Sequence, residues 1–480
     1  MSALADAISR ARPRSDLGDT SPFAGLHRRH ARTVDVVAQS VAATAPAGVL
    51  LLHPAATYAR SGSFGFFDIA VTITLVLGVA LVVGMFARRI ASTGSLYTFT
   101  ARGLGTHAGL VAGAALGVGC LAVAMNTLSA AAVRVANLIV WEAPEPPSWV
   151  APVLVALFGC VIAAVIAHGL RISTRLLLVL EIVAVITVIG LSVAALSLTR
   201  WDLGLLVPDF GAFSLDAVVA GVAVALIGFV GFESGTALGP ETRRPFAAVP
   251  RAIVLSVAAT GFVLLVGTAA QLSIVAEQPG AASLAAVTGA AGLIDAIVAV
   301  SFLACALAMT NAATRLAFAM SREGLLPPMF GVVSPRGVPA RGGIVLAALV
   351  TAVPLAVLAL GGTREAMRAV TSPASVVGFI LAYALLCAAA PVFLARIGEL
   401  TAPAAVLAAL PLIGLTTVLA VYLSSTSPEA APGLLGALAC LAALVVVGAV
   451  RLARHPLVAS RVGLHDAPVD TDCIDGSGRA

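Results

Sequence analysis

Long apolar stretches constrain this chain more than any other feature of its sequence. A membrane-spanning helix needs about 20 apolar residues in succession, and the sequence contains about twelve such stretches. They lie near residues 36–56, 66–87, 107–137, 149–168, 176–198, 215–238, 252–272, 291–318, 342–360, 372–394, 403–422 and 433–451. Only 11% of the residues are charged, against about 25% in ordinary soluble domains. The pattern predicts an all-α membrane protein with about twelve transmembrane helices.

The arginines predict how these helices are oriented. Every basic residue of this chain is Arg, and the arginines lie between the apolar stretches rather than in one patch, so the net charge of +5 does not indicate nucleic-acid binding. If the N-terminus is cytosolic, only Arg60, Arg200, Arg364 and Arg368 fall outside, while Arg134 lies within the third stretch. Basic loops favour the cytosolic side. We therefore expect a multi-pass membrane protein with both termini in the cytosol.

Two of the apolar stretches contain helix-breaking residues near their middle. The first stretch carries Pro46 and Gly48, and the sixth carries Gly228, Gly231 and Gly235. Unpaired backbone groups are costly in hydrocarbon, so a broken helix persists only where protein or a water-filled cavity surrounds it. Broken helices near mid-membrane form the binding sites of many secondary transporters. The sequence therefore predicts that helices one and six are broken at such a site.

The spacing of the two breaks predicts the organisation of the whole chain. They lie five helices apart, which indicates two five-helix repeats, and because five is odd the second repeat is inverted in the membrane. The expected segments are a cytosolic tail (1–34), a first repeat (35–198), a second repeat (199–395), helices eleven and twelve (396–452) and a second cytosolic tail (453–480). Because no Cys or His spacing is typical of a metal site, we expect neither metal nor cofactor.

Four sequence segments together carry a family resemblance. They are GFVGFESGTALGPETRRPFAAVPRAI (228–253), FARRIASTGSLYTFTARGLGTHAG (86–109), GLRISTRLLLVLE (169–181) and NAATRLAFAMSREGLLP (311–327). These segments resemble the amino acid-polyamine-organocation (APC) permeases, and the first is similar to that family's sixth helix and the loop after it. The resemblance implies the leucine-transporter-like fold of two inverted repeats. It also implies secondary active transport of an amino acid or related amine across the plasma membrane. We expect this transport to be proton-coupled or an exchange.

The break in the first helix suggests where a cargo carboxylate would bind. Unwinding frees N–H groups at the start of the outer half-helix, whose positive dipole end suits an anion. The expected cargo-binding residues there are Thr44, Ala45, Ala47 and Gly48. A simple proline kink at Pro46 is the alternative.

The break in the sixth helix suggests a complementary site for an ammonium group. Carbonyl groups of Ile227, Gly228 and Val230 would face the cavity and accept its hydrogen bonds. The resemblance implies an aromatic gate, for which Phe229 and Phe232 are the candidates, and a cargo contact from a polar residue of helix three, here Asn126. The alternatives are close helix packing for the glycines and an interhelical hydrogen bond for Asn126.

Buried acidic residues are expensive in a membrane and are therefore candidates for function. Glu233 lies inside the broken sixth helix, and the resemblance implies that it binds and releases a proton; its alternative is a structural acid that caps the helix. Glu181 is expected to be structural and to pair with Arg171 or Arg175. Thr310 and Asn311 would supply oxygen atoms if Na⁺ replaced the proton as the coupling ion.

Other function classes remain as alternatives. The same fold can carry another small solute, such as a nucleobase or a metal ion, or serve as a transporter-like sensor. A membrane enzyme would need a convergent cluster of catalytic side chains or metal ligands. The sequence shows no such cluster, so we do not expect an enzyme. The oligomeric state stays open.

Overall fold

Helices make up almost all of the computed structural model. It describes residues 22–466 apart from 24, 28, 140–145, 170, 202, 278–283, 285–287 and 429. The long helices are α2 (Thr33–Thr44), α3 (Pro46–Ser61), α4 (Gly65–Ala87), α5 (Leu96–Leu104), α6 (Thr106–Ile139), α7 (Val150–His168), α8 (Arg171–Leu198), α9 (Leu215–Ile227), α10 (Pro245–Glu277), α12 (Ala291–Arg322), α13 (Ala340–Ala359), α14 (Arg364–Arg396), α15 (Ala402–Ser424) and α16 (Ala431–Arg454). The chain also forms a 3₁₀ helix, η5 (Phe232–Glu241), and the short helix α17 (Pro456–Ala459).

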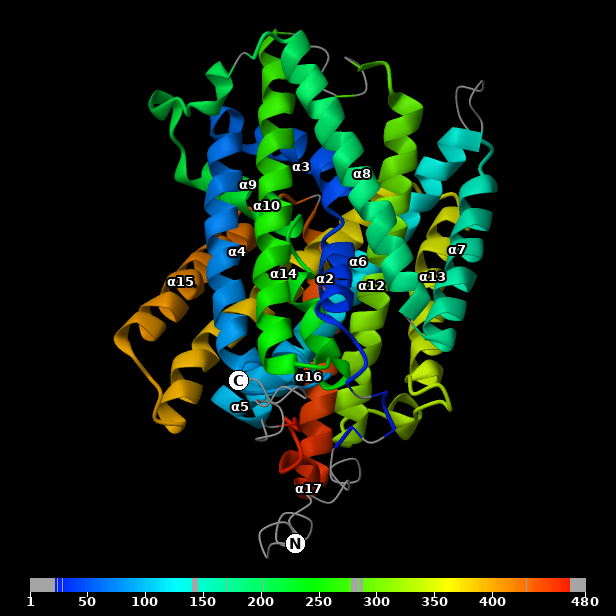
Figure 1. Ribbon diagram of the computed structural model, residues 1–480, viewed down its shortest axis with the longest axis vertical. Helices are drawn as coiled ribbons and strands as arrows, with labels where there is room; N and C mark the ends of the chain where they lie inside the picture. Colours follow the sequence, from blue (N-terminus) through cyan, green and yellow to red (C-terminus); the bar gives the residue numbers. More distant parts are fainter. Residues whose placement is uncertain are drawn as a thin grey trace, which may run out of the picture.

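The expected number of apolar helices is confirmed. Eleven helical segments among the described residues are long and apolar enough to cross a membrane. The first, Thr33–Ala87, joins α2, α3 and α4, so it contains the first two of the predicted stretches. The helices run roughly side by side along the long axis of the molecule (Figure 1).

Helices one and six are both broken, as the sequence predicts. The first consists of α2 and α3, and the sixth consists of α9 and η5. α2 contacts η5, whereas α3 contacts α9. Because the chain passes from α2 to α3 but from α9 to η5, the two broken helices run antiparallel, which is the relation expected of inverted repeats. Figure 1 shows α2 in the lower half of the molecule and α3 above it.

One helix was not expected from the sequence. Leu96–Leu104 lies outside all of the apolar stretches of the sequence, and it is too short to cross a membrane. It forms α5, which packs against α6 and α14. Phe99 of α5 stacks on Phe86 at 5.3 Å between ring centroids, and Phe86 stacks in turn on Phe393 at 4.8 Å. Aromatic packing therefore holds this helix against the others.

A glycine contact joins α6 to α14. A Cβ atom at Gly378 would lie 2.5 Å from the carbonyl oxygen of Ala115 and 2.8 Å from the backbone nitrogen of Gly119. Small residues allow two helix backbones to approach this closely in a membrane protein.

Gly378→Val is therefore expected to destabilise the protein by about 1–3 kcal/mol, the usual cost of forcing extra volume into a packed core. Backbone atoms cannot move aside as a flexible side chain can. Thermal denaturation in detergent, followed by size-exclusion chromatography, measures the effect. Gly436→Val is the matched control, because a Cβ there meets no atom within 4 Å; equal melting temperatures for the two variants would contradict the prediction.

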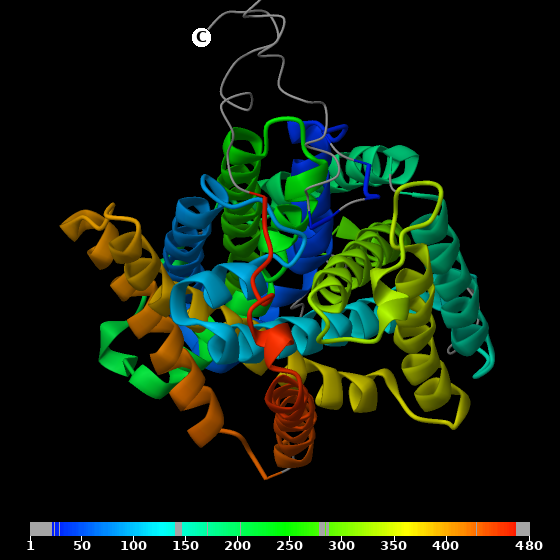
Figure 2. The ribbon, with the colours of Figure 1, turned by 90° about the horizontal axis from the view of Figure 1, so that it is seen from below.

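The described parts of both termini lie at one end of the helices, which we call the tail end. Ala31 pairs with Thr242, and Ala91 pairs with Asp466. Figure 2 views this end and shows the C-terminal segment, in red, crossing beside α5.

Glu323 fixes the C-terminal segment in this position. One carboxylate oxygen of Glu323 accepts hydrogen bonds from the backbone N–H groups of Gly463 (3.0 Å) and Leu464 (2.8 Å), and the other accepts the hydroxyl of Tyr97. Ser92 donates to the carbonyl of Leu464 at 3.1 Å. Burial raises the pKa of Glu323 from 4.5 to about 7, although these three donors oppose the shift.

Docking of the C-terminal segment is therefore expected to depend on pH. The docked state, with its raised pKa, binds a proton more tightly than a solvent-exposed Glu323 does, so docking is strongest at low pH and weakens as pH rises through about 7. Hydrogen exchange at Gly463 and Leu464 should be faster at about pH 8 than at about pH 6 after correction for intrinsic rates. Glu323→Gln keeps acceptor and donor atoms and should remove this difference; equal protection in wild type at both pH values would contradict the assignment.

Candidate functional site

The break in helix one falls on a single residue. Ala45 adopts a left-handed conformation with φ 46°, and its N–H bonds to the carbonyls of Val41 and Ala42, which ends α2. Pro46 then begins α3, a position where a proline's missing N–H costs nothing. The hydroxyl of Thr44 lies 3.2 Å from that of Thr260. The break is thus sharp, with both helix ends intact.

The first N–H groups of α3, which have no partner inside the helix, donate to protein side chains. The N–H of Ala47 donates to Glu181 Oε1 at 3.1 Å, and that of Gly48 donates to Ser301 Oγ at 3.2 Å. Ser301 Oγ also donates to Glu181 Oε1 at 2.9 Å. Three helices, α3, α8 and α12, therefore meet at one carboxylate.

Among the described residues, Ala47 and Ser301 hold the Glu181 carboxylate. Its side chain is 1% exposed, and the packing of α8 against α3 and α12 turns it toward the break. The predicted pairing with Arg171 or Arg175 falls on side chains that lie outside the described part, so it stays a prediction.

The break in helix six lies against the break in helix one. α9 ends at Ile227, and Gly231 has φ 99°, a left-handed conformation that side chains other than glycine rarely adopt. A Cβ atom at Gly231 would lie 2.2 Å from Met309 Cε and 3.0 Å from the Cβ of Ala43. Gly231 is therefore required both by its backbone angle and by the close approach of α2 and α12.

Glu233 occupies the second break much as Glu181 occupies the first. Its side chain is 1% exposed. Its Oε2 atom accepts hydrogen bonds from the N–H of Gly231 at 3.1 Å and from the hydroxyl of Tyr383 at 2.6 Å. Each break thus places one buried carboxylate on a backbone N–H group. Tyr383, on α14, was missed in the sequence because nothing near it in the chain marks it as a partner.

The remaining predicted residues surround these two breaks. Phe229 and Phe232 are buried, and the ring centroids of Phe232 and Tyr383 lie 5.5 Å apart. Gly228 and Val230 are buried, whereas Ile227 is partly buried. The Oδ1 atom of Asn126 on α6 is buried and has no hydrogen-bond partner among the described residues. Their roles as cargo contacts and gate stay predictions.

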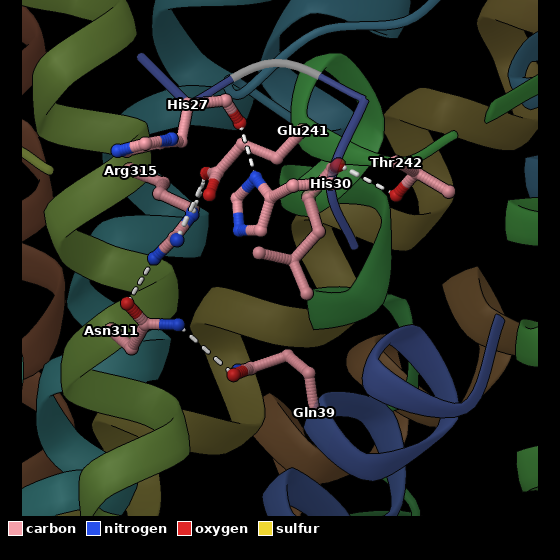
Figure 3. Close-up of polar contacts among 8 residues, drawn as sticks. His27, His30, Gln39, Glu241, Thr242, Asn311 and Arg315 are labelled. Carbon is pink, nitrogen blue, oxygen red and sulfur yellow. Dashed lines mark hydrogen bonds and ion pairs between the residues drawn. The ribbon is translucent and has the colours of Figure 1, made fainter. Parts of the chain in front are cut away.

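A chain of polar contacts runs from helix one to the tail end (Figure 3). Gln39 on α2 donates to the carbonyl of Ala308 at 2.8 Å and accepts from the Asn311 amide at 2.9 Å. Arg315 donates to Asn311 Oδ1 and forms an ion pair with Glu241 at 2.9 Å. The side chains of Arg315 and Glu241 are only 3% and 4% exposed.

This chain of contacts corrects one sequence assignment. The arginine distribution in the sequence leaves Arg315 on the cytosolic side, but it lies inside α12, where Glu241 neutralises it. The N-terminal segment covers the same pair: the N–H groups of His30 and Ala31 donate to the carbonyl of Glu241 at 2.8 and 2.9 Å.

The hydroxyl of Thr310 donates to Ala306 O at 2.7 Å. A sodium site at Thr310 and Asn311 stays a prediction.

Three known proteins show what this chain is similar to. The branched-chain amino acid permease BcaP of Lactococcus lactis is 31% identical over 184 residues, covering 34% of this chain and 38% of BcaP. The low-affinity putrescine importer PlaP of Escherichia coli is 25% identical over 284 residues, 56% of this chain and 61% of PlaP. The crystal structure of MhsT in complex with L-phenylalanine superimposes with a TM-score of 0.60 at 15% identity, covering 83% of this chain and all of MhsT.

The likeness to MhsT shows the fold, which is the leucine-transporter-like fold expected from the two broken helices. The likeness in sequence extends through almost the whole helical part, since residues 35–448 match the amino acid permease family. Both breaks, the carboxylates that occupy them and the polar chain from Gln39 to Glu241 lie inside that match. The chain therefore belongs to the amino acid permease family.

Proposed function

We propose that this protein is a secondary transporter that carries an amino acid or a related amine across the plasma membrane by alternating access. The observation that supports this most is the contact between two antiparallel broken helices at Ala43 and Gly231, in a chain of the amino acid permease family. In such transporters, broken helices that meet at mid-membrane form the site for a small polar cargo. BcaP and PlaP, by their names, carry amino acids and an amine.

The cargo site of this proposal lies between the two breaks. Its residues are Thr44, Ala45, Ala47, Gly48, Asn126, Ile227, Gly228 and Val230, with Phe229 and Phe232 as gate. Glu233 carries the coupling proton, in symport or exchange. The tail end faces the cytosol, because the basic loops gather on that side.

Counterflow in proteoliposomes tests the proposal. Vesicles loaded with an unlabelled amino acid or amine should accumulate the same labelled compound only when they contain the protein. A panel that covers neutral, cationic and anionic amino acids and their amines is needed. Absence of protein-dependent accumulation throughout that panel, with folded protein in the vesicles, would refute transport of this cargo class. Nucleobases and metal ions are the next compounds to test.

A further inference from the structure

The N–H groups that open the outer half-helix are already occupied. The first turn of a helix leaves its N–H groups without partners inside the helix. In α3, Pro46 has no N–H, Ala47 donates to Glu181 and Gly48 donates to Ser301. Val49 donates to the carbonyl of Ala45 at 2.9 Å. No donor of this turn is left for a carboxylate group of the cargo.

The side chain that fills this position is itself a carboxylate. Glu181 places Oε1 against Ala47 and Ser301, so the helix end that suits an anion holds one supplied by the protein. The other oxygen, Oε2, is buried and has no hydrogen-bond partner among the described residues. A buried carboxylate oxygen without a partner is unfavourable. It calls for a donor, and charged donors such as an ammonium group form strong hydrogen bonds to carboxylates.

A cargo carboxylate would be poorly accommodated at this break. It would have to displace Glu181 from Ala47 and then remain beside it, and two like charges repel strongly where water is excluded. An ammonium group has the opposite sign and carries three N–H donors. The occupied helix end and the unpaired Oε2 therefore both favour a cargo that carries an ammonium group and no carboxylate.

Resting on the proposed function, we propose that the cargo is an organic amine without an α-carboxylate, and that Glu181 is the residue that sets this specificity. Glu181 Oε2 accepts a hydrogen bond from the cargo ammonium, while Oε1 stays on Ala47 and Ser301. The half-helix end thus acts through Glu181: it holds the protein's carboxylate in place rather than the cargo's. An α-amino acid binds more weakly because its carboxylate competes with that of Glu181.

Pairs of compounds that differ only by a carboxylate test this proposal on the full-length protein. Suitable pairs are leucine with 3-methylbutylamine, phenylalanine with 2-phenylethylamine, and ornithine with putrescine. Binding is measured by thermal shift and by competition in counterflow. For at least one pair the amine should bind at least about tenfold more tightly than its amino acid, a difference of about 1.4 kcal/mol.

Glu181→Gln then tests the residue. The Gln carbonyl oxygen can still accept the bonds from Ala47 and Ser301, but the charge is lost, so amine affinity should fall by at least about tenfold. Glu323→Gln is the matched control: it removes a buried carboxylate at the tail end and should leave amine affinity unchanged. Unchanged amine affinity in Glu181→Gln would overturn the role of Glu181.

Measurements of the compound pairs on the wild-type protein do not depend on the folding of any variant. They also distinguish the specificity proposal from the transport proposal. Amino acids that bind while none of their amines do would overturn the specificity inference but leave the transport proposal standing. Failure of every compound in both series would instead count against the proposed function itself. If Glu181→Gln is not recovered folded, Ser301→Ala removes one of the bonds that position the carboxylate. It should weaken amine binding more than binding of the amino acid; equal effects on both would overturn the assignment.

Discussion

Arg315→Ala is expected to lower the free energy of unfolding by about 3–5 kcal/mol, the usual cost of removing one partner from a buried ion pair. The variant leaves Glu241 as a buried carboxylate without its arginine. It also removes the donor to Asn311, which links the pair to Gln39 on helix one. Thermal denaturation in detergent, read as the folded fraction by size-exclusion chromatography, measures the loss.

Two further variants show whether charge burial is the cause. Arg134→Ala breaks the ion pair between Arg134 and Asp295, whose side chains are 27% and 18% exposed. Water and ions screen such a pair, so this variant should lose less stability than Arg315→Ala. The double replacement of Arg315 and Glu241 by Met removes both charges and should recover most of the stability. If Arg315→Ala is no less stable than Arg134→Ala, the buried pair is not a major support of the fold.

The two helix breaks could be predicted from sequence because their causes are local. Pro46 lacks the N–H group that a continuous helix would need, and Gly231 allows a backbone angle that other residues avoid. Each effect is confined to the few residues around the proline or the glycine that causes it. The length and apolar character of the spanning helices are equally local, which is why their number was also predicted correctly.

The partners of the buried acids could not be predicted, because they depend on which helices pack together. Glu181 lies 134 residues from Ala47, and Tyr383 lies 150 residues from Glu233. Neither partner lies close to its acid along the chain, so only the three-dimensional packing of the helices reveals it. The same reason explains α5, whose polar sequence indicates a loop until its contacts with α6 and α14 are known.

Glu233→Gln is expected to leave transport active while removing most of its dependence on pH. The Gln carbonyl oxygen can accept the bonds from Gly231 and Tyr383, so the geometry of the second break is kept. The side chain no longer binds or releases a proton, so a step that Glu233 titrates in wild type no longer responds to pH. Uptake per folded transporter, measured from about pH 5 to about pH 8, shows the difference.

A purely structural Glu233 gives a different result in the same experiment. Removing its charge would then lower the amount of folded protein or scale uptake down equally at every pH, because no titrating step is lost. Tyr383→Phe separates the roles further: it removes the hydroxyl that donates to Oε2 but keeps the carboxyl group. Loss of this donor should shift the pH profile of a titrating Glu233 along the pH axis without flattening it. Wild type and both variants sharing one profile would show that the coupling proton binds elsewhere in the chain.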